Sequence, residues 1–361
     1  MKLRHLKISD LEEFITSNEF LKDEVIPITP IRALSQQRNP RAKPDDIVLT
    51  IAYAENQKIL GYIGALPDMV NGVRCAWNSC WWVKPGIPAE VSMKLLFSFI
   101  SNWNRKVLFS EMTPLTSSLI EQLRFCTHHT TSGFRGYNRF SLSEVLPRKK
   151  PVLGNIKRGL HLADLILNFF IGIFDRFKKN DLTFDCERIT AAQLTDADDD
   201  FMKQFNSALP ATRYAIDYQW IEQNPWVTLK ENADSRIVNG YYFSYSANLF
   251  ETSWVRFWHK GKTVALVNYT LKNSELKLPY VFCEPVFENE VGNYFFNFLK
   301  KNTHLSSITT FHAGLAAQFR NLNFIFKTSL PKLSAISNDL LLEAEITNFE
   351  MQMGDGDCVF T

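Results

Sequence analysis

The sequence has few glycines, only 15 in 361 residues, and this scarcity counts against a glycine-rich cradle for nucleotide phosphates. It also lacks a Cys-x-x-Cys pair, a His-x-His pair and a His-Glu-x-x-His motif, so no metal site is expected. No excess of one charge is present, because 40 Lys and Arg oppose 38 Asp and Glu. This balance excludes the strongly basic surface that nucleic-acid binding requires.

No secretory signal is predicted, because the N-terminus is charged and no apolar run follows it. Several of the six cysteines lie in apolar stretches, which favours buried, reduced thiols and a cytoplasmic location. They are Cys75, Cys80, Cys126, Cys186, Cys283 and Cys358.

Aromatic and apolar residues are plentiful, at 13% and 45% of the chain. A chain of this length is too long for one ordinary core, so two well-filled domains are expected. An internal repeat supports this division. Cys80–Pro85 is followed after four residues by Glu90–Ser92, and Tyr280–Pro285 is followed at the same spacing by Glu290–Gly292. We predict an N-terminal domain over 1–147, a basic and apolar linker helix over 148–182, and a C-terminal domain over 183–361.

The order of strands and helices around this repeat resembles the GNAT superfamily of acyltransferases. Gly61–Asp68 and Trp81–Pro85 are similar to the third and fourth strands of such a domain. Tandem copies also occur in peptidoglycan-bridge aminoacyl transferases and N-myristoyl transferases. The resemblance implies an α+β fold of two tandem domains, each with a mixed, mostly antiparallel sheet flanked by helices.

This resemblance also implies a reaction, the transfer of an acyl group from acetyl-CoA or another acyl-CoA to a small-molecule or peptide amine. The superfamily holds the CoA pyrophosphate with a loop of pattern (Gln/Arg)-x-x-Gly-x-(Gly/Ala). In this chain Glu90 and Glu290 replace the inner glycine, and only the last small position survives, as Ser92 and Gly292. A carboxylate there would repel a pyrophosphate. Two interpretations stay open, an enzyme with a rebuilt donor site and a non-catalytic binding protein of the same fold.

The resemblance places the donor around three residues of the first half and two of the second. These are Val83, Gly86 and Ser92, and Cys283 and Gly292. Acyl transfer also needs a base for the amine and an acid for the leaving thiolate.

The resemblance implies a tyrosine late in the domain as the acid, and Tyr137 is the positional match; Asp68 and Glu111 are the candidate bases. A surface tyrosine and solvated strand-end carboxylates would explain these residues equally well. Arginines between the first helix and the second strand could hold an acidic acceptor, or could simply be exposed. They are Arg32, Arg38 and Arg41.

The linker contains an apolar segment, Leu160–Phe174, with His161, Asp164 and Asn168 on one stripe and basic residues at both ends. It is too short to cross a bilayer. Two interpretations remain, a helix packed between the domains and a helix that contacts a membrane surface or a partner. The second would place the protein at the periphery of the inner membrane, with a lipid-linked or cell-wall acceptor as an alternative substrate.

Overall fold

The structure is a computed structural model that describes residues 1–175, 185–205, 213–347 and 349–361. The chain forms two compact units, which we treat separately, and neither is continuous in sequence. Unit 1 comprises 1–131, 189–253 and 331–361, and unit 2 comprises 132–188 and 254–330. The division at 1–147, 148–182 and 183–361 concerns consecutive segments of sequence and stays a prediction. Residues 176–182 of its linker lie outside the described residues.

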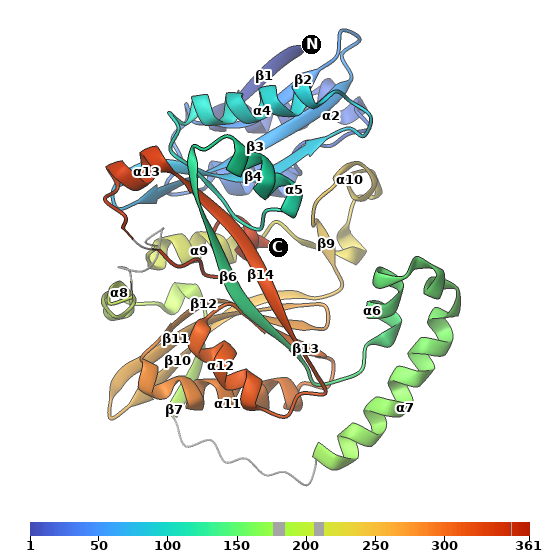
Figure 1. Cartoon of the computed structure of the whole chain (residues 1–361), viewed down its shortest axis with the longest axis vertical. Coiled ribbons are helices and arrows are strands. Elements are labelled where there is room, and N and C mark those ends of the chain that lie inside the picture. Colours follow the sequence, from blue (N-terminus) through green and yellow to red (C-terminus); the bar gives the residue numbers. More distant parts are fainter. Residues whose placement is uncertain (176–184, 206–212, 348) are drawn as a thin grey trace. The chain divides into compact units, whose positions relative to one another are not determined.

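Unit 1 is built mainly from the first half of the chain (Figure 1). Its strands are β1 (Lys2–Lys7), β2 (Ile47–Tyr53), β3 (Ile59–Val70), β4 (Val73–Val83), β5 (Val107–Phe109) and the short pair β8 (Thr228–Leu229) and β9 (Ser246–Ala247). Its helices are α1 (Leu11–Thr16), α2 (Asn18–Lys22), α3 (Pro30–Gln37), α4 (Ala89–Asn102), α5 (Pro114–Gln122), α8 (Asp196–Lys203), α9 (Ala215–Gln223), α10 (Ser235–Gly240) and α13 (Asn338–Glu343).

Unit 2 is built mainly from the second half. Its strands are β7 (Asp185–Ile189), β10 (Phe250–His259), β11 (Lys262–Lys272), β12 (Glu275–Cys283) and β13 (Ser307–Thr310), and its helices are α6 (Leu142–Lys149), α7 (Lys157–Asp175), α11 (Glu288–Lys301) and α12 (Ala313–Asn321). The strands β6 (Cys126–Tyr137) and β14 (Phe326–Ser337) contribute residues to both units, and so do β10, through Phe250–Ser253, and β7, through Ile189.

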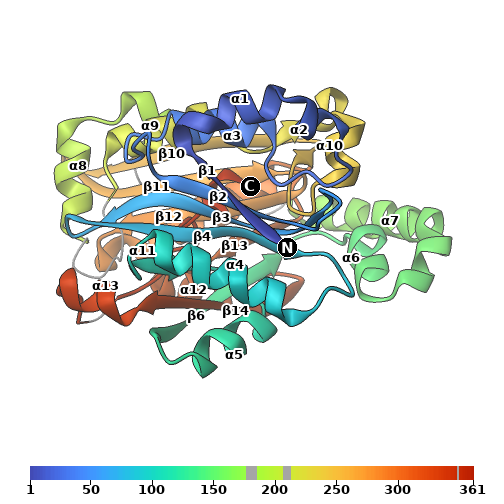
Figure 2. The same cartoon turned by 90° about the horizontal axis from the view of Figure 1, so that it is seen from above.

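The main sheet of unit 1 has the order β1-β2-β3-β4-β5-β14. Neighbouring strands are antiparallel except β4 and β5, which run parallel. Helices cover both faces, with α1–α3 on one side and α4 on the other (Figure 2). Successive side chains of β3 pack into the helix layers on opposite faces of the sheet, since Tyr62 packs toward the first helices and Ile63 toward α4. This alternation explains why the sequence here is apolar almost throughout.

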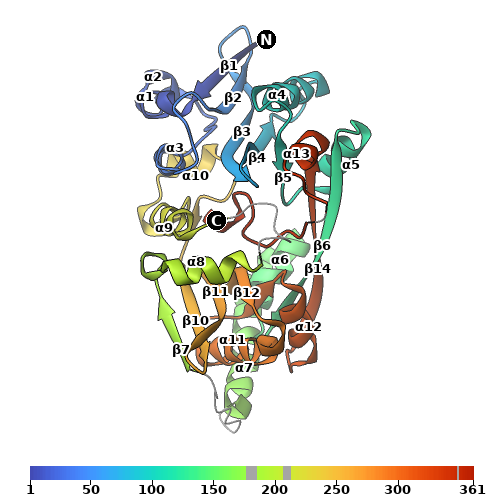
Figure 3. The same cartoon turned by 90° about the vertical axis from the view of Figure 1, so that its left-hand side faces the viewer.

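The sheet of unit 2 has the order β6-β13-β12-β11-β10-β7 and again contains one parallel pair, β12 with β13. Helices α11 and α12 lie together on one of its faces (Figure 3). Element lengths match those of unit 1, because α4 and α11 both have 14 residues and α5 and α12 both have nine. The predicted fold class, α+β with a mixed and mostly antiparallel sheet flanked by helices in each of two units, is confirmed.

The last strand of each sequence half completes the sheet of the other unit. In unit 1, β5 pairs with β14, which comes from the end of the second half, through Phe109 and Ala335. In unit 2, β13 pairs with β6, which comes from the first half, through Ser307 and Tyr137. Exchange of these strands explains why the compact units are interleaved in sequence.

Candidate functional site

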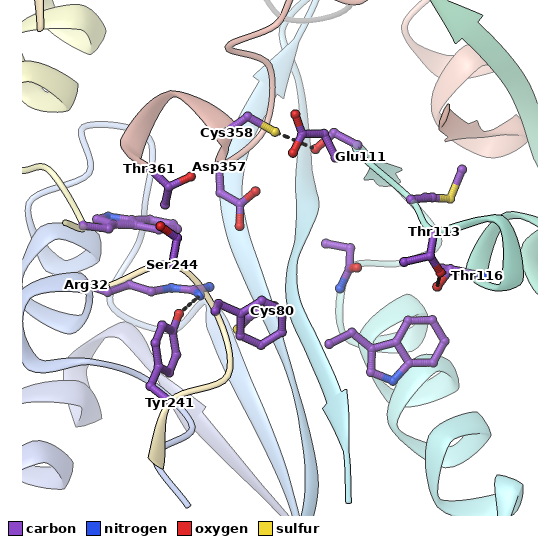
Figure 4. Close-up of a pocket in the computed structure, with 16 residues that line it drawn as sticks. Arg32, Cys80, Glu111, Thr113, Thr116, Tyr241, Ser244, Asp357, Cys358 and Thr361 are labelled. Atoms are coloured by element: carbon purple, nitrogen blue, oxygen red, sulfur yellow. Dashed lines mark hydrogen bonds between the residues drawn. The ribbon is translucent and has the colours of Figure 1, made fainter. Parts of the chain in front are cut away.

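A cavity of about 330 Å³ opens in unit 1 where the parallel strands β4 and β5 separate (Figure 4). Their last paired residues are Trp77 and Leu108, after which β4 continues to Val83 whereas β5 ends at Phe109. The lining comes from β4, from the segment after β5, from α3, from the residues after α10, from Trp226 and from the segment 357–361. It comprises Arg32, Asn78, Cys80, Trp81, Ser110, Glu111, Met112, Thr113, Thr116, Trp226, Tyr241, Phe243, Ser244, Asp357, Cys358 and Thr361.

A β-bulge in β4 shapes this cavity. Ile63 pairs with Trp81 and Gly64 pairs with Ser79, so Cys80 is the extra residue, and its φ is 56°. A bulge re-aims side chains and interrupts the ladder, and bulges are common beside active sites. Gly64 is required opposite the bulge, because a Cβ there would lie 2.2 Å from the carbonyl oxygen of Ser79.

We therefore expect Gly64→Ala to lower the free energy of unfolding by about 1–3 kcal/mol, as overpacking of a closed site does. Guanidinium unfolding followed by circular dichroism measures this change. Gly159→Ala is the matched control, because no atom lies within 4 Å of a Cβ at that position. Equal unfolding midpoints for the two variants would contradict the assigned role of Gly64.

Arg32 is the buried cation of the cavity, with 2% of its surface exposed. It follows the start of α3, where Thr29 caps the helix by accepting the Arg32 backbone N–H and Pro30 occupies the first turn. Its guanidinium donates to the Tyr241 hydroxyl at 3.0 Å and to the Ser79 hydroxyl at 2.8 Å. It also stacks over Trp226, with its central carbon 4.4 Å from the ring centre.

Two carboxylates, Asp357 and Glu111, line the same cavity. Asp357 accepts the Ser79 hydroxyl, and burial raises its pKa although the nearby Arg32 opposes that shift. Glu111 is exposed, lies two residues after the end of β5 and has a φ of 50°. Few residues other than glycine adopt that backbone conformation, and such residues gather at functional sites. Figure 4 shows both carboxylates near Cys358.

Asp68, the other predicted base, lies in the core of unit 1 with 2% of its surface exposed. Its oxygens accept from Arg41 at 2.5 Å, from the Trp77 indole at 2.8 Å and from Arg213 at 3.2 Å. Arg41 also forms an ion pair with Asp217. These contacts favour a structural role for Asp68, and they show that Arg41 is engaged inside the protein. The catalytic role of Asp68 stays a prediction.

Tyr137, the predicted acid, belongs to unit 2. It ends β6 and lines a separate cavity of about 280 Å³ together with Arg135, Glu275 and Ser307. The structure therefore does not bring it together with Glu111 in one described cavity. Of the three predicted arginines, Arg32 alone lines the cavity beside β4, and Arg38 donates to the Asn224 side chain.

The first-half donor residues surround the start of α4. Val83 ends β4, Gly86 is exposed with a φ of 82°, and Ser92 lies within the helix. Glu90 does not cover the loop as expected, because its carboxylate forms an exposed ion pair with Lys94 one turn along the helix. The first turn of α4 therefore carries one acid, Glu90, whose charge is offset by Lys94.

The second-half residues are arranged differently. Cys283 ends β12 and is buried, with its thiol donating to the Glu284 carbonyl. Gly292 lies inside α11, where a Cβ would meet Gln318 of α12 at 2.7 Å. The first turn of α11 carries two acids, Glu288 and Glu290, and burial raises the pKa of Glu288. This helix start is unfavourable for a pyrophosphate. The donor assignment of all five residues stays a prediction.

Sequence reasoning missed Tyr241 and Asp357, which come from loops with no periodic pattern.

Within residues 1–175, 185–205, 213–347 and 349–361, no group of three metal-ligating side chains is present. Among those same residues, no helix is long and apolar enough to cross a membrane.

No protein-family model matches the sequence, and the search of curated proteins gives no match. Solved structures do match. A probable N-acyltransferase from Enterococcus faecalis has a TM-score of 0.50 at 10% identity, over 94% of this chain and 72% of its own. The N-myristoyltransferase of Saccharomyces cerevisiae with bound myristoyl-CoA has a TM-score of 0.48 at 11% identity, over 93% and 78%. A GCN5-related N-acetyltransferase from Anabaena variabilis has a TM-score of 0.47 at 10% identity, over 94% of this chain and 74% of its own. Taken with the strand order and the parallel β4–β5 pair, the match at 0.50 shows that the chain shares the fold of this probable N-acyltransferase, in agreement with the GNAT-like fold predicted from the sequence.

Proposed function

We propose that this protein is an N-acyltransferase that moves an acyl group from a CoA thioester to an amine, with its reaction centre in unit 1. The observation that carries the proposal is the cavity between the separating strands β4 and β5, beside the bulge at Cys80. Separation of two parallel strands leaves room for an extended chain such as pantetheine between them. Carboxylates, a phenol and a guanidinium lie around that opening, which is the set of groups that acyl transfer uses.

The donor is proposed to bind at the loop 84–88 and the first turn of α4. Gly86 leaves open space around the backbone, and the exposed Lys84 supplies a positive charge at the same loop. Amides at a helix start favour phosphate groups. Unit 2 has two acids at the corresponding helix start, so we propose that it has no donor site and serves a structural or binding role.

Glu111 is proposed as the base that takes the proton from the acceptor amine. It is exposed at the cavity, whereas Asp357 is bound to Ser79 and close to Arg32. Tyr241 is proposed as the acid for the leaving thiolate, in place of Tyr137, because its hydroxyl lies in the same cavity as Glu111. The Arg32 guanidinium would attract an acceptor that also carries a carboxylate.

Binding of acyl-CoA provides the test. We expect acetyl-CoA or a longer acyl-CoA at 100 times its dissociation constant to stabilise the folded protein by about 2.7 kcal/mol, seen as a rise in melting temperature. Lys84→Glu should weaken binding about ten-fold, as the loss of a charge contact of about 1.4 kcal/mol would. Lys58→Glu is the control, since Lys58 is also exposed but lies in the turn between β2 and β3.

The absence of a shift with every acyl-CoA at millimolar concentration would overturn the donor proposal. Binding without release of free CoA, across a panel of primary amines, would instead support the non-catalytic alternative.

A further inference from the structure

Helix α7 is attached to its neighbours through its polar side. The Asp164 carboxylate accepts the backbone N–H groups of Leu142 and Ser143, at 2.6 and 2.9 Å, and so caps the start of α6. Asn168 both donates to and accepts from the backbone of Phe140, at 2.8 Å in each direction. Figures 1 and 2 both show α6 and α7 as neighbouring helices. Asp164 and Asn168 of the polar stripe noted in the sequence therefore face α6 and the residues before it, whereas His161 is exposed.

The apolar side of α7 faces outward as a result. Leu162, Leu165, Ile166 and Phe169 recur at helical spacing, and between 52% and 67% of each is exposed. In the turn before the helix, Val152 and Ile156 are exposed as well. A soluble helix ordinarily buries such a stripe, and contiguous apolar patches of this kind mark interaction surfaces. We call these six residues the α7 face.

Within residues 150–169, the exposed charges around the α7 face have one sign. Lys150, Lys157 and Arg158 are exposed, and Asp164 is the only acid in residues 150–169. That acid is buried against α6, so it presents no negative charge at the surface. An apolar helix face with a cationic border is complementary to an anionic lipid surface, whose headgroups attract the cations while the apolar side chains enter the acyl boundary.

We propose that the α7 face docks on a bilayer that contains anionic phospholipid, with the helix lying in the plane of the interface. This surface differs from the cavity of unit 1, and the proposal does not depend on acyltransferase activity. A protein partner is less favoured as the occupant, because described residues 150–169 present no exposed acid that would pair with a basic group of such a partner.

Vesicle flotation with the full chain tests this proposal. Vesicles of phosphatidylcholine with 30% phosphatidylglycerol should bind the protein about ten-fold more tightly than pure phosphatidylcholine vesicles, and added salt should reduce the difference. Leu165→Gln combined with Phe169→Gln should weaken binding to the anionic vesicles about ten-fold or more. Leu115→Gln is the matched control, because Leu115 is 83% exposed on α5, and it should bind as the unchanged protein does.

Folding of the double variant is verified by its circular dichroism spectrum and melting temperature, which should match those of the control because both changes lie at the surface. The proposal is overturned if the unchanged protein fails to float with anionic vesicles, or if the double variant floats equally well. It is also overturned if light scattering shows a dimer that the double variant abolishes, since a second copy would then cover the face.

Discussion

Glu111→Gln is expected to lower kcat for acyl transfer by about 100- to 1,000-fold, which is the usual contribution of a general base. The amide retains the size and shape of the side chain but cannot accept a proton at neutral pH. The free energy of unfolding should change by less than about 0.5 kcal/mol, because Glu111 is exposed and shares the cavity with a second carboxylate, Asp357.

The rate is measured as the release of free CoA thiol, with the amine that gives the highest rate in the panel described above. Glu121→Gln is the control, since Glu121 is an exposed acid near the end of α5. It should leave kcat unchanged. A kcat for Glu111→Gln within three-fold of the unchanged protein would remove Glu111 from the proposed mechanism.

Asp68→Asn is expected to lower the free energy of unfolding by about 3–5 kcal/mol, the cost of removing one partner from a buried ion pair. Arg213 and Arg41 would lose the carboxylate that balances their charge, although Arg41 keeps its ion pair with Asp217. Urea unfolding measures the change. Glu90→Gln is the control, because the exposed Glu90–Lys94 pair contributes little.

The stability that Asp68 provides should also depend on pH. Burial alone would raise its pKa, but Arg213 and Arg41 outweigh burial and lower it. A carboxyl whose pKa is lower in the folded state contributes stability above its unfolded pKa, near 4, and loses it as the pH falls through the folded value. The difference in stability between the unchanged protein and Asp68→Asn should therefore be largest above about pH 5 and shrink below pH 4.

A loss below about 1 kcal/mol in Asp68→Asn, together with a large loss of kcat, would show that Asp68 is catalytic and not structural. The two variants thus separate the two carboxylates that sequence position alone had treated as equivalent.

Much of the fold follows from local patterns. The apolar strands around Trp81, the amphipathic helix after Pro85 and their repetition near Tyr280 and Pro285 are enough to predict an α+β architecture with two similar units. Strand and helix periodicity report which face of an element is buried, and turn residues report where it ends. Glu111 could also be selected from the sequence as a candidate base, because a carboxylate just after a predicted strand is recognisable there.

Local sequence patterns cannot specify which strand or helix an element packs against. An amphipathic strand such as β14 shows which face it buries but not which sheet edge it completes, so the exchange of β6 and β14 between the units depends on tertiary structure. For the same reason the sequence does not predict that Asp357 and Tyr241 line one cavity with Arg32. Their proximity depends on packing between segments far apart in the chain. The shortage of glycine predicted the absence of an ordinary phosphate loop. Only the structure decides that Glu90 turns toward Lys94 and that α7 directs its apolar side outward, because both depend on what lies beside each helix.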